Sequence, residues 1–324
     1  SNPFLRGIFA AMLDLSYIAP PVDRDLLKSE LTPERFIRST GKLDNEIYIV
    51  NIHNAPNVVR EVGRLREITF ASADGGTGKE VDLDELDLSE HCYEQLIVWN
   101  PEEEEIVGGY RFIDGAVIAA HGDWKHDLSM GHYFDFSERF IAEYLPKSIE
   151  LGRSWVQPKY QPANDPRKGM FALDNIWDGL GAICLKYDHI EHFYGKVTMY
   201  PTYNREARNY VLNFLRHYFP DTEGLMVPSV AADVPVIDLD AEQFPVDAED
   251  FAKSFKMGQR NLNKVCTTFG ESIPPLIKQY MGLSPKMMTF GTFINADFGN
   301  VEETGILIPI DTIYDEKKER YIRL

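Results

Sequence analysis

The sequence predicts an α/β protein of the α+β type, built around one mixed β-sheet with helices on its faces. Short apolar runs with strand character alternate along the chain with longer segments of helical periodicity, a pattern typical of a sheet covered by helices. The chain has 324 residues, 44% of them hydrophobic and 26% charged. That length and composition are typical of a globular protein with a sizeable core.

Charge excludes some classes of function. The chain has 51 acidic and 33 basic residues, a formal net charge of -18, which repels a phosphate backbone, so we expect no nucleic-acid partner. Apolar runs stay shorter than the roughly 18 residues of a membrane-spanning helix. The 3 cysteines are widely spaced and form neither a disulfide nor a zinc pattern. We therefore expect a cytoplasmic protein without a bound metal.

Residues 1–45 are expected to form a helical N-terminal extension. Apolar side chains recur at helical spacing between Phe4 and Leu13, and Pro20 and Pro21 end that helix. The helix packs on the core in the simpler interpretation. In the alternative it lies on a membrane surface, although Arg6 is its only cation.

Residues 46–324 are expected to form a single domain, with its core at 46–220. Proline opens the first helix, as is common at that position, an acidic turn joins two strands, and a loop of turn formers at 158–169 precedes a long helix. The predicted strands span 46–52, 93–99, 105–112, 147–157 and 191–199, and the predicted helices span 56–70, 170–187 and 204–218.

Two further segments complete the predicted domain. Residues 221–270 are interpreted as an insertion in which 9 acids without a base, at 221–250, are followed by a helix near 248–264 with a basic face. Residues 271–324 are expected to add a helix near 273–280 and closing strands near 287–292 and 303–310.

Several segments resemble known binding or catalytic motifs but lack a required residue. The glycine-rich stretch before Glu80 lacks the first glycine of a phosphate-binding loop, because Ala73 stands there, and lacks the final Ser or Thr. A calcium loop fails because Asp87 replaces the required glycine. Histidines form no recognisable ligand set, and Ser154 is not in a nucleophile elbow.

The most informative segment is the apolar strand at 148–156, which contains Glu150 and Arg153. Charges inside an apolar strand are costly unless they are paired or functional. A bulge at Gly152 brings Glu150 and Arg153 towards one side, as often happens near active sites. A purely structural Glu–Arg pair is the alternative. The following loop offers Arg167 and Lys168 near a helix start, where an anion such as a pyrophosphate is favoured.

Taken in order, these segments resemble the acyl-donor half of the GNAT acyltransferase superfamily. The resemblance runs from about residue 46 to 310 and rests on motif order, because each motif is short. The matching pieces are an Arg-x-x-x-Phe helix at 63–70, an Asp-x-x-Asp segment at 84–87, the strand Val107-Gly108-Gly109-Tyr110-Arg111, the strand 149–156, the helix 273–280 and Asp297-Phe298.

Within that superfamily the sequence is most similar to the branch called hemolysin-like, which includes ornithine-lipid and glycine-lipid N-acyltransferases. It resembles the acyl-homoserine-lactone synthases more distantly. Two departures stand out: Pro166 occupies a position where the family's phosphate loop usually has Arg or Gln, and the tryptophan that follows the Arg-x-x-x-Phe helix in lactone synthases is missing. A lactone synthase is therefore disfavoured.

The resemblance implies a mixed sheet whose fourth and fifth strands splay apart. It also implies transfer of a long, 3-hydroxylated acyl chain from an acyl carrier protein phosphopantetheine thioester, or from acyl-CoA, to the amine of glycine or ornithine in aminolipid synthesis. The implied partners are acyl carrier protein and a small amino acid, with possible peripheral contact to the cytoplasmic membrane face.

The resemblance also suggests roles for individual residues. Glu150 is the candidate base, because burial raises a carboxyl pKa towards the useful range, and Arg153 and Arg111 orient it or bind the substrate carboxylate. Tyr194 or Tyr200 protonates the leaving thiol. The substrate-binding candidates are Arg66, Phe70, Asp84, Asp87, Trp155, Tyr194 and Tyr200, and the donor-binding candidates are Ser154, Val156, Arg167, Lys168 and Gly169, with backbone N–H groups at 154–156 polarising the thioester carbonyl.

Some alternatives stay open. Asp84 and Asp87 either attract the substrate ammonium or hold Arg66. An acidic carrier protein needs a basic docking patch, for which Lys159, with Arg167 and Lys168, or the basic run 253–264 are candidates. Two other functions remain: a small-amine acetyltransferase that uses acetyl-CoA, and a non-catalytic acyl-binding protein.

Overall fold

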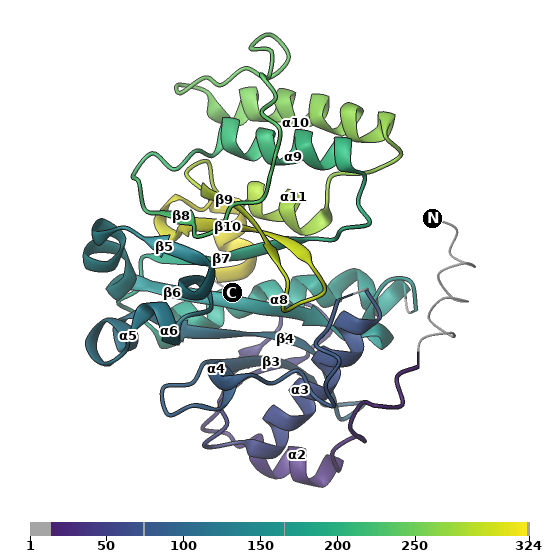
Figure 1. The fold of residues 1–324 in the computed structure, drawn as a ribbon. Coiled ribbons are helices and arrows are strands. Elements are labelled where there is room, and N and C mark those ends of the chain that lie inside the picture. Colours follow the sequence, from purple (N-terminus) through teal and green to yellow (C-terminus); the bar gives the residue numbers. More distant parts are fainter. Residues whose placement is uncertain (1–13, 74, 165, 323–324) are drawn as a thin grey trace.

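The computed structural model describes residues 14–73, 75–164 and 166–322, apart from the side chains of 166–171 and 173. The amphipathic helix predicted at residues 4–13 lies outside these ranges. An eight-stranded sheet with the order β1-β2-β3-β4-β6-β7-β10-β9 forms the centre of the molecule (Figure 1). Neighbouring strands are antiparallel except β6 and β7, which are parallel. The predicted mixed sheet is thus confirmed.

The strands follow the predicted ranges closely in the core. The main sheet contains β1 (Phe36–Ser39), β2 (Glu46–Val50), β3 (Glu94–Asn100), β4 (Glu105–Asp114), β6 (Ser148–Val156), β7 (His192–Met199), β9 (Met288–Asn295) and β10 (Val301–Pro309). A separate two-stranded sheet pairs β5 (Phe134–Phe136) with β8 (Met226–Pro228).

Helices cover both faces of the main sheet. The α-helices are α2 (Arg24–Glu30), α3 (Pro56–Ala71), α4 (Glu85–Leu88), α5 (Gly115–His121), α6 (Trp124–Asp127), α7 (Ser129–Tyr133), α8 (Pro166–Lys186), α9 (Arg205–Tyr218), α10 (Phe251–Thr268), α11 (Pro275–Met281) and α12 (Asp315–Lys317). No helix in the described ranges is long and apolar enough to cross a bilayer.

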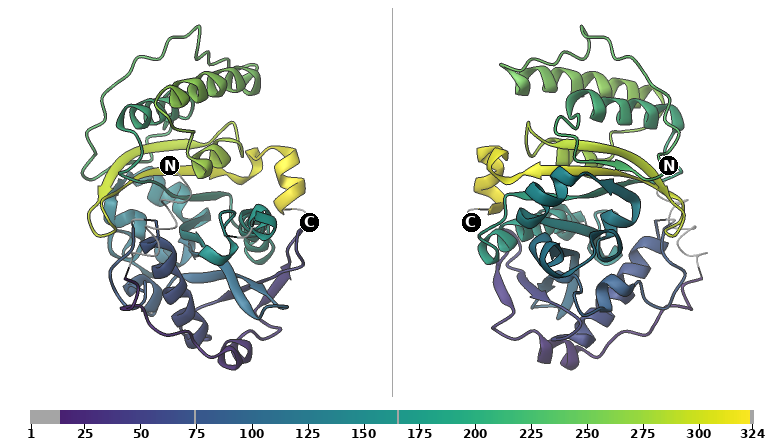
Figure 2. Two further views of the ribbon diagram at one scale, coloured as in Figure 1. Left: turned by 90° about the vertical axis from the view of Figure 1, so that its right-hand side faces the viewer. Right: turned by 60° about the vertical axis from the view of Figure 1, so that its left-hand side comes forward.

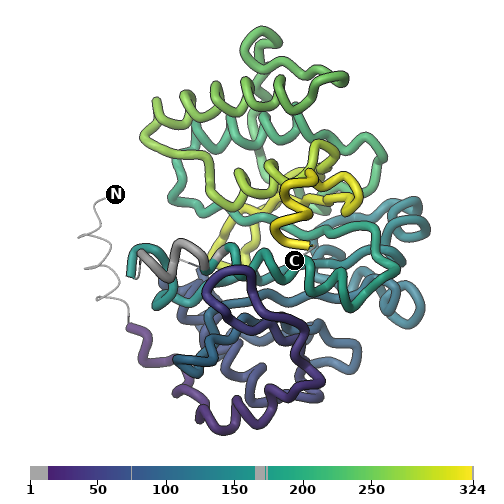
Figure 3. The backbone as a smooth tube through the Cα atoms, turned by 180° about the vertical axis from the view of Figure 1, so that it is seen from behind, coloured from purple at the N-terminus to yellow at the C-terminus, as the bar shows by residue number. Residues whose placement is uncertain are grey.

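The two faces of the sheet carry different cores, because side chains alternate along each strand. Leu96 and Ile149 belong to the cluster that includes α8, whereas Ile97 belongs to the cluster that includes α3. Helix α8 packs on β3, β4 and β6, and its coil crosses the middle of the molecule when viewed from behind (Figure 3). Helices α9 and α10 lie side by side beyond β9 and β10 (Figures 1 and 2).

Residues 14–45 differ from the expected helical extension. They form the short helix α2 and then β1, which extends the sheet by pairing with β2, Phe36 lying opposite Tyr48. The two rings meet edge to face at 5.7 Å. A strand of four residues is too short to produce a readable periodicity. The same reason explains why the short helices α5, α6 and α7 are not among the predicted elements.

The parallel strands β6 and β7 stay together for only part of their length. They pair from Ser148 opposite His192 to Leu151 opposite Gly195. Beyond that point β6 continues along β4 and β7 continues along β10, so the two strands separate. The predicted splaying of these two strands is confirmed. We call the opening beyond Leu151 and Gly195 the strand split.

Candidate active site at the strand split

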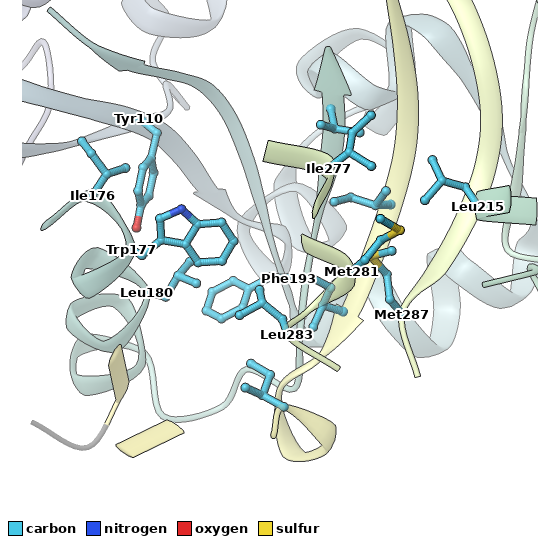
Figure 4. Close-up of a cluster of buried hydrophobic side chains, with 14 of the residues drawn as sticks. Tyr110, Ile176, Trp177, Leu180, Phe193, Leu215, Ile277, Met281, Leu283 and Met287 are labelled. Carbon is cyan, nitrogen blue, oxygen red and sulfur yellow. The ribbon is translucent and has the colours of Figure 1, made fainter. Parts of the chain in front are cut away.

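A cavity of about 690 Å³ occupies the strand split. Its lining comes from both faces of the sheet. On the face of the sheet that α8 covers, here called the α8 face, the lining is apolar. Figure 4 shows that it includes Tyr110, Ile176, Trp177, Leu180 and Phe193. On the α3 face the cavity is polar and is lined by Arg153, Tyr194, Lys196, Thr198 and Glu303 beside Phe70 and Phe298. The cavity therefore joins an apolar compartment to a charged one through the sheet.

A β-bulge shapes the β6 side of the split. The register between β4 and β6 passes from Gly109 opposite Trp155 to Arg111 opposite Gly152, so one residue of β4 faces both Arg153 and Ser154. Arg153 has a positive φ of 51°, which is uncommon for a residue with a side chain. The sequence analysis expected a bulge at Gly152, and the structure has it at the two residues that follow.

The bulge directs Arg153 to the α3 face. Its guanidinium lies 4.3 Å from the ring centre of Phe298, within the range of a cation–π contact. It also lies 3.2 Å from Asp82, so its charge has a carboxylate partner. Burial lowers the pKa of Arg153, although Asp82 opposes that effect.

Three aspartates bind two further arginines next to this position. Arg66 is fully buried and contacts Asp82 at 3.3 Å and Asp87 at 3.1 Å. Arg111 contacts Asp84 at 2.7 Å and Asp87 at 3.0 Å. Burial alone raises the pKa of Asp87, but Arg66 and Arg111 outweigh it and hold that pKa well below its usual range. Asp84 and Asp87 thus hold arginines, and none of these five side chains lines the cavity.

Glu150 lies on β6 at the base of the split, and its side chain is nearly fully buried, with 1% exposure. The hydroxyl of Tyr93 donates to one carboxylate oxygen, and the backbone N–H of Met130 donates to the other at 2.8 Å. Burial raises the pKa of Glu150 to about 7, although Lys196 opposes the shift. Neither Arg111 nor Arg153 contacts this carboxylate, so the expectation that they orient it is not met.

Tyr194 lies opposite Glu150 in the parallel register and lines the cavity. Its hydroxyl is buried and has no hydrogen-bond partner among the described residues. Burial raises the pKa of Tyr194 well above its ordinary value, so the phenol stays protonated and available as a donor. Tyr200, the other tyrosine named in the sequence analysis, also lines the cavity.

The remaining predicted residues are distributed more widely. Phe70 and Ser154 line the cavity. Trp155 packs in the α3 core and Val156 packs against the α8 core, and neither lines the cavity. Arg167, Lys168 and Gly169 lie in the first turn of α8, which begins at Pro166, and their side chains lie outside the described part of the chain.

The two candidate basic patches differ in their contacts. Lys159 forms an ion pair with Glu105 at 2.6 Å. Lys253, Lys256, Arg260 and Lys264 of α10 are exposed, and none forms an ion pair with another residue that the structure describes. The predicted basic face of this helix is thus present.

Three charged residues that line the cavity were missed by the sequence analysis: Lys196 on β7, Glu303 on β10 and Glu271, which follows α10. Lys196 is a charged residue within a largely apolar strand, which is the signal that drew attention to Glu150. Glu303 belongs to a Val-Glu-Glu-Thr run, so the sequence alone does not show which glutamate faces inward. Among the described residues, no group of three or more His, Cys, Asp or Glu is arranged to hold a metal ion.

Comparisons with known proteins agree with this geometry. Residues 65–166 match the family described as "Acetyltransferase (GNAT) domain". The chain is 48% identical over 307 residues to a protein of Bacteroides thetaiotaomicron named "Glycine N(alpha)-acyltransferase", covering 94% of this chain and 89% of that protein. It is 45% identical over 305 residues to a protein of Phocaeicola vulgatus with the same name, covering 94% of this chain and 92% of that protein. No solved structure gives a significant match.

Proposed function

Because this chain belongs to the GNAT acyltransferase family, we propose that it transfers a long acyl chain from a phosphopantetheine thioester to the amine of a small amino acid. Glycine is the first candidate acceptor, since two relatives that share nearly the full length are named glycine N-acyltransferases. An acyl carrier protein is the proposed carrier, and an N-acyl amino acid for aminolipid synthesis is the proposed product. Because that product is amphipathic, we also propose loose contact with a membrane surface.

The cavity that crosses the sheet is the observation on which this proposal rests. Its α8 compartment is lined by Tyr110, Ile176, Trp177, Leu180 and Phe193, which offer an apolar surface for an acyl chain. Burying methylene groups there is favourable, at about 0.8 kcal/mol for each. A volume of about 690 Å³ falls in the range of about 300–1,000 Å³ typical of cavities that enclose a drug-sized ligand. An acetyl group needs far less room.

The chemistry has a proposed place for every proton. The amino acid arrives as an ammonium and must lose one proton before its nitrogen attacks the thioester carbonyl. The C–N bond forms, the C–S bond breaks and the nitrogen loses a second proton. One proton leaves with the thiol, and we propose that the cavity-lining hydroxyl of Tyr194 delivers it. The other goes to Glu150, whose pKa of about 7 suits a base near neutral pH.

Two features of the site limit how Glu150 acts. Its carboxylate is held by Tyr93 and Met130 and does not line the cavity, so the proton reaches it through an intervening group. Tyr194 lies opposite Glu150 on β7 and lines the cavity, and we propose it as this group. Backbone N–H groups at 154–156, beside the bulge, are proposed to polarise the thioester carbonyl.

A carrier-protein donor is supported by the basic face of α10. The chain as a whole is strongly acidic, and carrier proteins are acidic too, so docking requires a local patch of opposite charge. Four exposed bases on α10 provide one. The helix ends at Thr268, and Gly270, Glu271 and Ser272, which follow directly, line the cavity. A partner on this helix would therefore lie close to one wall of the cavity.

A transfer assay with product identification by mass spectrometry tests the proposal. The purified protein is offered a 3-hydroxyacyl carrier protein, the matching acyl-CoA and acetyl-CoA in parallel, each with a mixture of amino acids. We expect a long-chain N-acyl amino acid, formed fastest from the carrier protein. An acetylated amine as the main product would instead favour a small-molecule acetyltransferase.

A further inference from the structure

Lys196 presents a half-buried positive charge to the cavity. It is the first residue of β7 beyond the last pair with β6, and its side chain lines the polar compartment. The ammonium donates to the Ser129 hydroxyl at 2.6 Å and lies 5.6 Å from the ring centre of Tyr133. No carboxylate of a described residue lies within 4 Å of it. Burial lowers the pKa of Lys196, although the nearby carboxylates of Glu303 and Glu150 oppose that shift.

An ammonium that is partly withdrawn from water and has no carboxylate in direct contact is costly. An ammonium has three N–H donors, and only the bond to Ser129 is made within the described part of the chain. Arg153, the other cation of the cavity, already has Asp82 beside it. Of the two cavity cations, Lys196 is therefore the one with N–H donors left for an anionic ligand.

Glu303 lies close by on the same face of the sheet. On β10 it is opposite Thr198, and Gly305 is opposite Lys196, so Glu303 is two residues from the position across from Lys196. Its side chain is 5% exposed and lines the cavity. The carboxylate accepts from the Thr198 hydroxyl at 3.1 Å and from the Asn295 amide at 2.8 Å. Neutral donors thus hold it in place without neutralising its charge.

These observations place a cation that touches no carboxylate of the described residues near a fixed carboxylate where the sheet opens. We propose that Lys196 and Glu303 bind the acceptor amino acid as a zwitterion, with Lys196 on its carboxylate and Glu303 on its ammonium. This inference rests on the proposed function and specifies its acceptor site. It also assigns recognition of the substrate carboxylate to Lys196, a role that the sequence analysis gave to Arg153 and Arg111.

The zwitterion has a mechanistic consequence. With its ammonium at Glu303, the acceptor lies on the polar face of the split, while the acyl chain occupies the apolar face near Trp177 and Leu180. The thioester carbonyl then lies between them, beside Ser154 and Tyr194. Lys196 selects amines that carry a neighbouring carboxylate, so it acts as a specificity-determining residue.

A comparison of two acceptors tests this role. Glycine and glycinamide differ in whether a carboxylate is present, and both carry the reacting amine. We expect the wild-type protein to prefer glycine. Lys196→Met should lower kcat/KM for glycine by roughly 10- to 100-fold, the value of a hydrogen bond to a charged group, and leave glycinamide nearly unchanged. Lys196→Arg should restore part of the preference because it keeps the charge.

Glu303→Gln provides the complementary result. Because both acceptors carry the ammonium, this change should lower kcat/KM for both of them and leave their ratio unchanged. Lys125→Met is the matched control, since Lys125 is an exposed lysine paired with Asp135 at 3.2 Å and lies outside the cavity. This control should leave kcat/KM unchanged for both acceptors. Thermal unfolding checks that each variant is folded, and Lys196→Gln replaces the methionine variant if that one is not.

The outcomes separate this inference from the proposed function. An equal loss for glycine and glycinamide in Lys196→Met would overturn carboxylate binding by Lys196 while leaving acyl transfer to amines intact. If the wild-type protein forms no amide with either acceptor, the proposed function fails, and the inference fails with it.

Discussion

Leu151 on β6 and Gly195 on β7 form the last pair between these two parallel strands, and both line the cavity that opens beyond them. A Cβ atom on Gly195 would lie 2.5 Å from the carbonyl oxygen of Leu151. The two strands therefore lie so close at this pair that a residue larger than glycine does not fit at position 195. The position of the pair fixes where the sheet opens and hence where the cavity lies.

Replacing Gly195 tests this relationship. In Gly195→Ala the new methyl group meets backbone, so the strands must shift, and we expect a loss of about 1–3 kcal/mol in the free energy of unfolding, as for overpacked sites. Gly152→Ala is the control for stability, because no neighbouring heavy atom lies within 4 Å of its Cβ position. Urea denaturation measures both. Equal midpoints for the two variants would show that the close approach is unimportant.

Filling the apolar compartment should shorten the accepted acyl chain. Leu180 on α8 lines the cavity and is 7% exposed, whereas Leu185 on the same helix is 63% exposed. Leu180→Trp should lower kcat/KM for a long-chain donor at least about 10-fold, the cost of losing a few buried methylene groups, and spare a short-chain donor. Leu185→Trp should leave the chain-length profile as it is. A parallel loss for long and short donors in Leu180→Trp would place the chain elsewhere.

The pH dependence of the reaction should report Glu150. Because burial raises its pKa to about 7, the ionised, basic form appears as the pH rises through neutrality, so kcat should rise with a midpoint near 7. Glu150→Gln should remove this midpoint and lower kcat by about 10²–10⁴-fold, as for loss of a general base. A variant with the wild-type rate and profile would exclude this role.

The raised pKa of Glu150 also affects stability, and there a rise in pH is unfavourable, whereas it favours the reaction. The folded protein holds a proton on Glu150 that the unfolded chain releases between pH of about 4.5 and about 7. The contribution of this residue to the free energy of unfolding is therefore complete at low pH and is lost as the pH rises through that window. Denaturant titrations of the wild-type and Glu150→Gln proteins at pH 5 and pH 8 measure the difference.

Tyr194 and Tyr110 form a matched pair for testing thiol protonation. Both are buried, both line the cavity and neither hydroxyl has a hydrogen-bond partner among the described residues. Tyr194 lies opposite Glu150, whereas Tyr110 faces α8. Tyr194→Phe should lower kcat by about 100-fold, within the range for a lost general acid, and Tyr110→Phe should not. Similar kcat values for the two variants would remove Tyr194 from the chemistry.

Much of the fold follows from sequence pattern because its core elements are long and strongly apolar. The strand predicted at 191–199 is β7 at His192–Met199, and the strand predicted at 147–157 is β6 at Ser148–Val156. The short strand β1 was missed because four residues give no usable periodicity. Its place in the sheet depends on tertiary contacts such as that between Phe36 and Tyr48.

The site was predicted less completely than the fold, for a physical reason. A charged residue in an apolar strand shows that something must compensate it, but the partner is set by strand pairing. Glu150 was singled out correctly as a buried charge, yet its contacts are Tyr93 and Met130 and not an arginine. Arg66 and Arg111 are held by aspartates. Lys196 and Glu303 come together only because β7 pairs with β10.

A single-turnover experiment with labelled glycine tests the central claim most directly. The protein, in excess over a long-chain acyl carrier protein, is mixed with ¹⁵N-glycine and the products are followed by mass spectrometry. We predict that the label appears in a long-chain amide at the rate at which the thioester disappears. Loss of the thioester as free fatty acid, with the glycine unchanged, would contradict acyl transfer to an amino acid at the strand split.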